Sequence, residues 1–178
     1  MKIIGLFSGG KTAIGPKLSP TGIFKKPVER VDVNALGIVG DVQADTRVHG
    51  GPEKALHQFS LASYQKIIQR YPLLHLKARP GSIGENLSSI TMHENSVCIG
   101  DIYSLGTCLL QVSSPRIPCW KIDAKFSQPG LSQFIAQHQL SGWYYRVLEE
   151  GKIQLGDEFS LVERLNARLT IRYFLSLT

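Results

Sequence analysis

The chain has 178 residues, which is enough for one substantial hydrophobic core and too few for two domains of ordinary size. Hydrophobic residues make up 43% and charged residues 19% of the sequence, a balance typical of a packed globular protein and not of a disordered one. The formal net charge is +6, but lysines and arginines occur singly or in pairs, so no nucleic-acid arm is indicated. No stretch approaches the ~20 consecutive apolar residues of a membrane span and no secretory signal is present, so we expect a cytoplasmic protein without membrane contact.

Short β-rich segments, each bounded by Gly, Pro, Asn or Asp, dominate the chain. In chain order, the expected strands are 2–7, 28–33, 55–60, 101–106, 108–113, 143–148 and 158–163. Two segments, 61–71 and 131–139, have apolar residues at helical spacing. We therefore predict a mainly β single domain over 1–178, a barrel with a few helices around it.

Two short connections predict β-hairpins. Gly106-Thr107 stands between DIYSL and CLLQVS, and Glu150-Gly151 stands between WYYRVLE and KIQL. Each is short enough to join its flanking strands as antiparallel neighbours.

The sequence also repeats a short pattern. IGDIYSL begins at Ile99 and LGDEFSL begins at Leu155. We interpret both as a turn into a strand, with the side chains of Asp101 and Asp157 hydrogen-bonded to the backbone two residues further on. Neither aspartate is therefore expected to be catalytic.

Cys119 is the candidate functional thiol. Two prolines fix the backbone around Arg116, and the positive charges of Arg116 and Lys121 favour a thiolate at Cys119. Such a thiolate could be a nucleophile, a redox sensor or a ligand for a soft metal, and the alternative is a small buried hydrophobe. Cys98 and Cys108 lie in apolar, strand-like segments and are expected in the core. The cysteine spacing indicates neither a zinc site nor a disulfide framework.

The loop His49-Gly50-Gly51-Pro52 is a second candidate, because glycines let backbone N–H groups approach an anion and Arg47 and Lys54 add positive charge. The alternative for His49 is a turn histidine bonded to the backbone. His57 lies in an alternating strand and could face the core or the barrel mouth. The remaining histidines, at 75, 93 and 138, are expected at the surface, and no histidine spacing indicates a metal site.

Asn86 follows Gly84-Glu85 in a short extended segment, where its amide offers a donor and an acceptor to the edge of a heterocycle. The alternative is an Asx-type turn. The segment 1–27 contains no residue that we match to chemistry.

Six loops and strands occur in a fixed order along the chain: G-D-x-Q-A-D from Gly40, R-V-H-G-G-P-x-K-A-L from Arg47, G-E-N-L from Gly84, I-G-D-I-Y from Ile99, S-x-P-R-x-P-C-W-K from Ser113 and G-W-Y-Y-R-V-L from Gly142. In this order they resemble the MOSC domain family, named after the C-terminal domain of molybdenum cofactor sulfurase. The resemblance is greatest to its bacterial, YiiM-like branch and is strongest over 37–162. Members of this branch commonly continue into a helical C-terminal region, which we expect to be absent or shortened here.

The resemblance implies a distorted mixed β-barrel of the MOSC type, with a cleft for a molybdenum cofactor in its molybdopterin form. Cys119 matches the ligand cysteine of the P-C-[YW]-K motif, so the resemblance implies that it binds the molybdenum and takes part in catalysis. The other residues whose motifs line this cleft are Arg47, His49, Gly50, Gly51, Asn86, Ser113 and Arg116. We expect both arginines to balance phosphate charge, Asn86 to contact the pterin and His49 to donate a proton.

The activity that the resemblance implies is reduction of small N-hydroxylated substrates, such as N-hydroxylated purine bases. The sequence has no iron–sulfur cysteine spacing, haem motif or dinucleotide fingerprint, so we expect a separate flavin- or iron-containing reductase as electron donor. One alternative is a sulfur or molybdenum-cofactor carrier that uses Cys119 as a persulfide, and another is a redox-sensing barrel. Pyridoxal phosphate binding is expected only at the level of the family, and the oligomeric state stays open.

Overall fold

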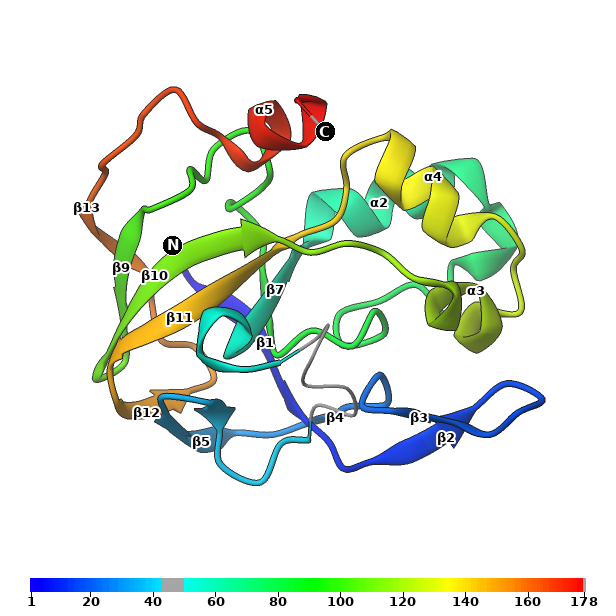
Figure 1. Cartoon of the computed structure of the whole chain (residues 1–178), viewed down its shortest axis with the longest axis horizontal. Coiled ribbons are helices and arrows are strands. Elements are labelled where there is room, and N and C mark those ends of the chain that lie inside the picture. Colours follow the sequence, from blue (N-terminus) through cyan, green and yellow to red (C-terminus); the bar gives the residue numbers. More distant parts are fainter. Residues whose placement is uncertain (43–49, 178) are drawn as a thin grey trace.

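The computed structural model describes residues 1–42 and 50–177 (Figure 1). Its main feature is a curled eight-stranded sheet that forms half of a barrel, with strand order β13-β9-β10-β11-β7-β8-β1-β4. The strands are β1 (Ile3–Ser8), β4 (Lys26–Pro27), β7 (Leu56–Ser60), β8 (Leu87–Ser89), β9 (Ile102–Leu105), β10 (Cys108–Pro115), β11 (Trp143–Glu149) and β13 (Ser160–Glu163). Neighbours are antiparallel except β7 and β8, which are parallel. The predicted mainly β, mixed barrel fold is confirmed.

Two smaller sheets extend this one. β12 (Gly151–Gln154), β5 (Arg30–Asn34) and β6 (Gly37–Ile38) form a three-stranded sheet, and β2 (Thr12–Ile14) pairs with β3 (Ser19–Thr21). Both lie along the lower side of the molecule in Figure 1.

One of the two predicted hairpins forms and the other does not. Cys108 pairs with Leu105, so β9 and β10 are joined at Gly106-Thr107 as expected. The prediction of a hairpin at Glu150-Gly151 is wrong, because β12 pairs with β5 and not with β11. The physical reason is that β11 already has a neighbour on each side, β10 and β7, so it has no free edge to offer to β12.

The helices gather mainly on one side of the curled sheet, where Figure 1 shows α2 (Leu61–Arg70), α3 (Trp120–Phe126) and α4 (Leu131–Gln137) together. α5 (Ile171–Ser176) lies near the C-terminus, and Pro52–Lys54 and Pro72–Leu74 are short 3₁₀ helices. The helices predicted at 61–71 and 131–139 are confirmed, whereas α3 was not predicted. In the described part of the chain, no helix has the length and apolar character that crossing a membrane requires.

Local signals explain where α2 begins and ends. The Ser60 hydroxyl accepts a hydrogen bond from the backbone N–H of Ser63 at 3.1 Å, which caps the first turn. Tyr64 and Ile67 point into the core at helical spacing. The helix ends at Arg70, two residues before Pro72, which cannot continue it.

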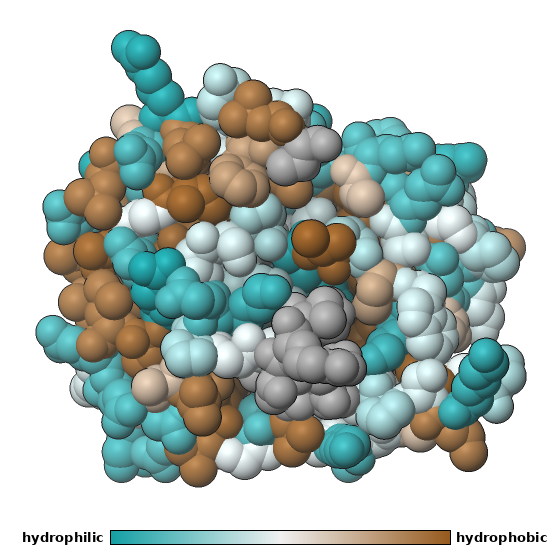
Figure 2. All heavy atoms as spheres, in the orientation of Figure 1, coloured by the Kyte–Doolittle hydropathy of each residue, from teal (hydrophilic) through white to brown (hydrophobic). Residues whose placement is uncertain are grey.

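The buried apolar side chains form two clusters. One is built mainly from strands of the large sheet and includes Trp143, Tyr145 and Phe159. The other joins the sheet to the helices through residues such as Tyr64 and Ile122. β7 contributes to both clusters, which explains why all of its side chains are buried. Figure 2 shows that the surface is a patchwork of hydrophilic and hydrophobic residues, with hydrophobic ones along the side that carries β9 and β13.

The repeated aspartate turn is structural, as predicted. The Asp101 carboxylate accepts from the Cys98 N–H at 2.9 Å, and the Asp157 carboxylate accepts from the Gln154 N–H at 2.8 Å. The bonded backbone group therefore lies three residues before the aspartate and not two after it. Asp101 is fully buried and also forms an ion pair with Arg164 at 2.7 Å.

Candidate functional site

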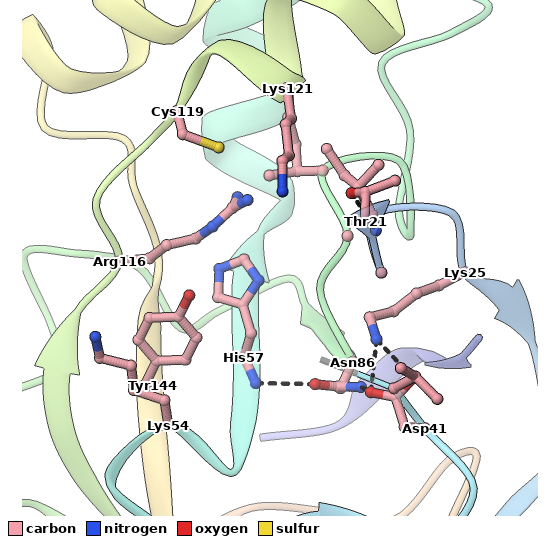
Figure 3. Close-up of a pocket in the computed structure, with 15 residues that line it drawn as sticks. Thr21, Lys25, Asp41, Lys54, His57, Asn86, Arg116, Cys119, Lys121 and Tyr144 are labelled. Carbon is pink, nitrogen blue, oxygen red and sulfur yellow. Dashed lines mark hydrogen bonds and ion pairs between the residues drawn. The ribbon is translucent and has the colours of Figure 1, made fainter. Parts of the chain in front are cut away.

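A pocket opens where β7, β11, the start of α3 and several loops meet (Figure 3). Its lining residues are Thr21, Gly22, Ile23, Lys25, Asp41, Val42, Lys54, His57, Ile83, Gly84, Asn86, Arg116, Cys119, Lys121 and Tyr144. The cavity has a volume of about 80 Å³. A buried water needs roughly 10–15 Å³ on this scale, so the pocket admits a small group or one end of a larger ligand.

Cys119 is the residue from which α3 starts. It lies in extended backbone directly before the helix, and its side chain makes no capping hydrogen bond there. Figure 3 shows the sulfur pointing into the pocket, on the side of Arg116 and Lys121. The thiol is only partly buried. Cys119 therefore lies in the pocket, and its role as the functional thiol stays a prediction.

Arg116 and Tyr144 face each other on the Cys119 side of the pocket. Arg116 is 7% exposed and lies beside Tyr144 in the pocket (Figure 3). Burial raises the pKa of Tyr144, while Arg116 acts in the opposite direction. The Lys54 ammonium lies 5.9 Å from the centre of the Tyr144 ring. This side of the pocket thus combines a neutral hydroxyl donor with two cations.

A buried ion pair closes the opposite side. Lys25 donates to both carboxylate oxygens of Asp41 at 2.6 Å, and both side chains are 5% exposed. The same carboxylate accepts from Asn86 Nδ2 at 2.8 Å and from the Gly9 N–H at 2.8 Å. Among the lining residues that the structure describes, Asp41 is the one carboxylate, and this pair neutralises it.

Asn86 lines the pocket, but its amide is used largely within the protein. Nδ2 donates to Asp41 and to the Phe7 carbonyl, and Oδ1 accepts from the His57 N–H at 3.1 Å. Asn86 therefore ties β1, β7 and Asp41 together, and one lone pair of Oδ1 remains for a ligand.

His57 faces the pocket from β7 and is 4% exposed. Within residues 1–42 and 50–177, its Nε2 is buried without a hydrogen-bond partner. The pKa of His57 is lowered well below 6.5, mainly by burial and then by Arg116, while the Ser141 and Gly84 carbonyls act in the opposite direction. His57 is therefore neutral at pH 7. Of the two positions that the sequence left open, the barrel mouth is the correct one.

The structure brings Cys119, Arg116 and Asn86 together, as predicted, but not every expected residue. Gly50, Gly51 and Ser113 are described and do not line the pocket. The Ser113 hydroxyl donates to the Glu53 carbonyl. The predicted residues Arg47 and His49 lie outside the described part of the chain.

Sequence reasoning missed several lining residues. The expectation that 1–27 contributes nothing is wrong, because Thr21, Ile23 and Lys25 line the pocket. Asp41 and Tyr144 were also missed as individual residues. Both stand inside motifs that carried the family resemblance, and that position was the available signal. The segment 21–25 has no comparable motif.

Cys98 and Cys108 are buried, as predicted. Burial, and then Asp157, raises the pKa of the Cys108 thiol to about 11. Burial, and then Asp101, raises the pKa of the Cys98 thiol. Both thiols stay neutral at pH 7 and act as small core residues. Among the described residues, no three His, Cys, Asp or Glu side chains are grouped as metal ligands.

Comparison with known proteins identifies a bacterial and a fungal relative. The chain is 35% identical to protein YiiM of Escherichia coli K12 over 159 residues, covering 88% of this chain and 70% of that protein. It is 38% identical over 156 residues to a protein of Gibberella moniliformis named Reductase, covering 86% of this chain but only 28% of the fungal protein. The match therefore leaves most of the fungal protein uncovered.

A solved structure shows the same architecture. The crystal structure of YiiM from Geobacillus stearothermophilus aligns with 99% of this chain and 82% of its own, with a TM-score of 0.80 and 34% identity. The family model described as the MOSC domain matches residues 45–160. The segments that this match spans include β7, β11 and the Cys119 loop of the pocket. The chain therefore belongs to the MOSC domain family, in the neighbourhood of the bacterial YiiM proteins.

Proposed function

We propose that this protein is a molybdenum-cofactor-dependent reductase of small N-hydroxylated compounds, with Cys119 as the protein ligand to molybdenum. The MOSC family is associated with the molybdenum cofactor, and one relative is named a reductase. The observation that carries the proposal is the pocket itself, in which the Cys119 sulfur faces a buried arginine and two lysines. Thiolates are the protein ligands that soft metals prefer.

The residues of the pocket fit such a cofactor in chemistry and in charge. Lys54, Arg116 and Lys121 line it as cations, which suits an anionic phosphate. The unpartnered Nε2 of His57 is a buried polar atom that lacks a hydrogen bond among the described residues. A cavity of about 80 Å³ encloses only one end of a pterin, so the remainder would lie along the open mouth.

The described residues also suggest how protons are handled. Reduction of an N-hydroxylated amine to an amine and water consumes two electrons and two protons, and the bound cofactor supplies the electrons. Tyr144 is protonated at neutral pH, and burial raises its pKa further, so its hydroxyl can donate a hydrogen bond to the substrate oxygen. Arg116 lines the pocket beside Tyr144 and acts against the effect of burial on its pKa. His49 remains our other candidate proton donor.

Electrons must come from outside the chain under this proposal, because the sequence has no motif for a nicotinamide, haem or iron–sulfur group. We expect a separate flavin- or iron-containing reductase, with an acidic face that matches the net charge of +6. NADH or NADPH alone should then give no turnover, and reduced viologen should restore it. Steady turnover with a nicotinamide alone, in a preparation free of flavoprotein, would contradict this part of the proposal.

The test is to replace Cys119 by serine, which preserves the loop but substitutes a hard hydroxyl for the soft thiolate. Protein made in a cofactor-competent host is analysed for molybdenum, and hydroxylaminopurine reduction is measured with reduced viologen. We expect about one molybdenum per chain in the parent and loss of both metal and activity in Cys119→Ser. The matched control is Cys108→Ala, which also removes one thiol but lies in the core.

Three outcomes separate the alternatives. Equal activity in Cys119→Ser and the parent would show that Cys119 is not the ligand. A sulfane-sulfur signal on Cys119 without molybdenum would support the sulfur or cofactor carrier instead. If the folded protein contains neither molybdenum nor sulfane sulfur, the redox-sensing barrel is the alternative that remains.

A further inference from the structure

A second hollow, with a volume of about 1010 Å³, lies next to the pocket, and Lys25 lines both. It is formed by the end of β1 and the loop after it, by the start of β2, by β4 and the two residues before it, by the loop at 76–82 and by the end of α3. We call it the basic groove and define it by Phe24, Lys26, Lys77, Arg79 and Lys125. None of these five residues lines the pocket that holds Cys119.

The lower part of the groove is aromatic and tightly shaped. Phe7 and Phe126 line it and are 7% and 2% exposed. Gly81 crosses Phe7 so closely that a Cβ there would lie 2.7 Å from the ring, and its φ of +89° also favours glycine. The inner wall of the groove is therefore formed by tightly packed residues, Phe7, Gly81 and Phe126.

The rim of the groove is strongly basic. Its described lining contains Lys25, Lys26, Lys77, Arg79 and Lys125 and no acidic residue. Lys25 is paired with Asp41, but the side chains of Lys26, Lys77 and Arg79 are exposed and make no hydrogen bond or ion pair within the described part of the chain. Three free cations around one hollow are a site for an anion with more than one negative charge.

Phe24 adds a flat apolar surface to these charges. It precedes β4 and is 40% exposed, and the Lys125 ammonium lies 5.0 Å from the centre of its ring. Lys125 is held in place by a hydrogen bond to the Ile23 carbonyl at 2.9 Å. Burial is the main cause that lowers the pKa of Lys125 to about 8, so a nearby anion would favour its charged form.

We propose that the basic groove binds a nucleotide, with the phosphates on Lys26, Lys77 and Arg79 and the base against Phe24. A nucleoside diphosphate combines the two features that the groove offers, a multiply charged anion and a flat ring. Small-molecule sites typically have volumes of roughly 300–1,000 Å³, which the groove matches. An acidic peptide would use the charges but has no need of an exposed aromatic ring in a hollow. The proposal does not depend on the chemistry at Cys119.

The test is calorimetric titration of the purified protein with ADP at low salt, where phosphate contacts are least screened. We expect saturable binding that weakens by at least about tenfold in Lys77→Ala/Arg79→Ala, because charge-assisted contacts are lost. The matched control is Lys66→Ala/Arg168→Ala, which removes two exposed charges outside the groove and should bind ADP like the parent. Cys119→Ser should also bind ADP normally, so a failure of the proposed reductase function would leave this result standing.

A second variant tests the aromatic part separately. Phe24→Ala should weaken ADP binding and leave the affinity for inorganic pyrophosphate unchanged, because only the base stacks on the ring. The proposal is overturned if ADP does not bind the parent, or if the groove and control double variants lose affinity equally. A glutamate-rich peptide that competes with ADP and binds the groove more tightly than ADP does would assign the groove to an acidic protein partner instead.

Discussion

Replacing Asp41 by asparagine should destabilise the fold strongly, because it leaves the Lys25 ammonium buried without a countercharge. The Asp41 carboxylate lies 2.6 Å from the Lys25 ammonium, and both side chains are 5% exposed. An asparagine has nearly the same shape but only one oxygen, so it can accept from the Gly9 N–H or from Asn86 Nδ2, which bond different oxygens of Asp41, but not from both. The loss should therefore combine the unpaired Lys25 charge, which is the larger part, with one lost hydrogen bond.

The magnitude follows from the burial of the pair. Breaking a buried ion pair by removing one partner costs about 3–5 kcal/mol, compared with about 0–1 kcal/mol for an exposed pair. With a urea dependence of about 2 kcal/mol per molar, the midpoint of unfolding should fall by roughly 1.5–2.5 M. The double variant Lys25→Met/Asp41→Asn removes both charges and should recover part of this loss.

The assay is equilibrium urea unfolding, followed by tryptophan fluorescence. The control is Asp32→Asn, because Asp32 pairs with Lys152 at 3.6 Å in a pair whose side chains are 66% and 68% exposed. It should change the unfolding free energy by less than about 1 kcal/mol. If Asp41→Asn is as mild as Asp32→Asn, or if the double variant is the least stable of all, the argument from the buried charge is refuted.

Two further predictions concern the pocket. Arg116→Ala and Arg47→Ala should each lower the molybdenum and pterin content of the purified protein, because a bound phosphate needs charge-assisted donors. The control is Arg30→Ala, in the three-stranded sheet, which should leave this content unchanged. Unchanged content in both Arg116→Ala and Arg47→Ala would place the phosphate elsewhere. His57 has a pKa well below 6.5 in the folded protein, so its stabilising contribution is complete above about pH 6.5 and is lost as the pH falls, because the unfolded chain then binds the proton. Between pH 7 and pH 5 the parent should therefore lose more unfolding free energy than His57→Gln, by no more than about 1.4 kcal/mol per pH unit, measured by urea titration. Equal losses would assign the acid sensitivity to another group.

The strands and helices with strong local patterns could be predicted from the sequence, but their partners could not. β7 was expected at 55–60 and found at Leu56–Ser60, because alternation and flanking turns are local signals. The pairing of β12 with β5 depends on which strand edges are free, and this joins segments that are far apart in the chain. α3 has seven residues and no capping side chain, so its start carried no local signal.

The site shows the same division between local and distant information. Cys119 and Arg116 stand in one motif, and the sequence alone placed them together. Lys25 lines the pocket because it pairs with Asp41, which lies 16 positions further along the chain. No local sequence signal indicates this pair. The expected roles of Gly50 and Gly51 were based on loop composition and on the family resemblance, and neither determines where this loop lies relative to the pocket.

The strand order of the large sheet has a consequence for the time at which the pocket forms during synthesis. His57 belongs to β7, whose neighbours are β8 and β11, and β11 ends at Glu149. Pairings between such distant segments form slowly, because a long loop must close before any contact compensates for its entropy. β7 therefore has only one of its two partners until most of the chain has left the ribosome. Under the proposed function, the cofactor could therefore enter this pocket only after translation has passed β11, when β7 has both of its neighbours.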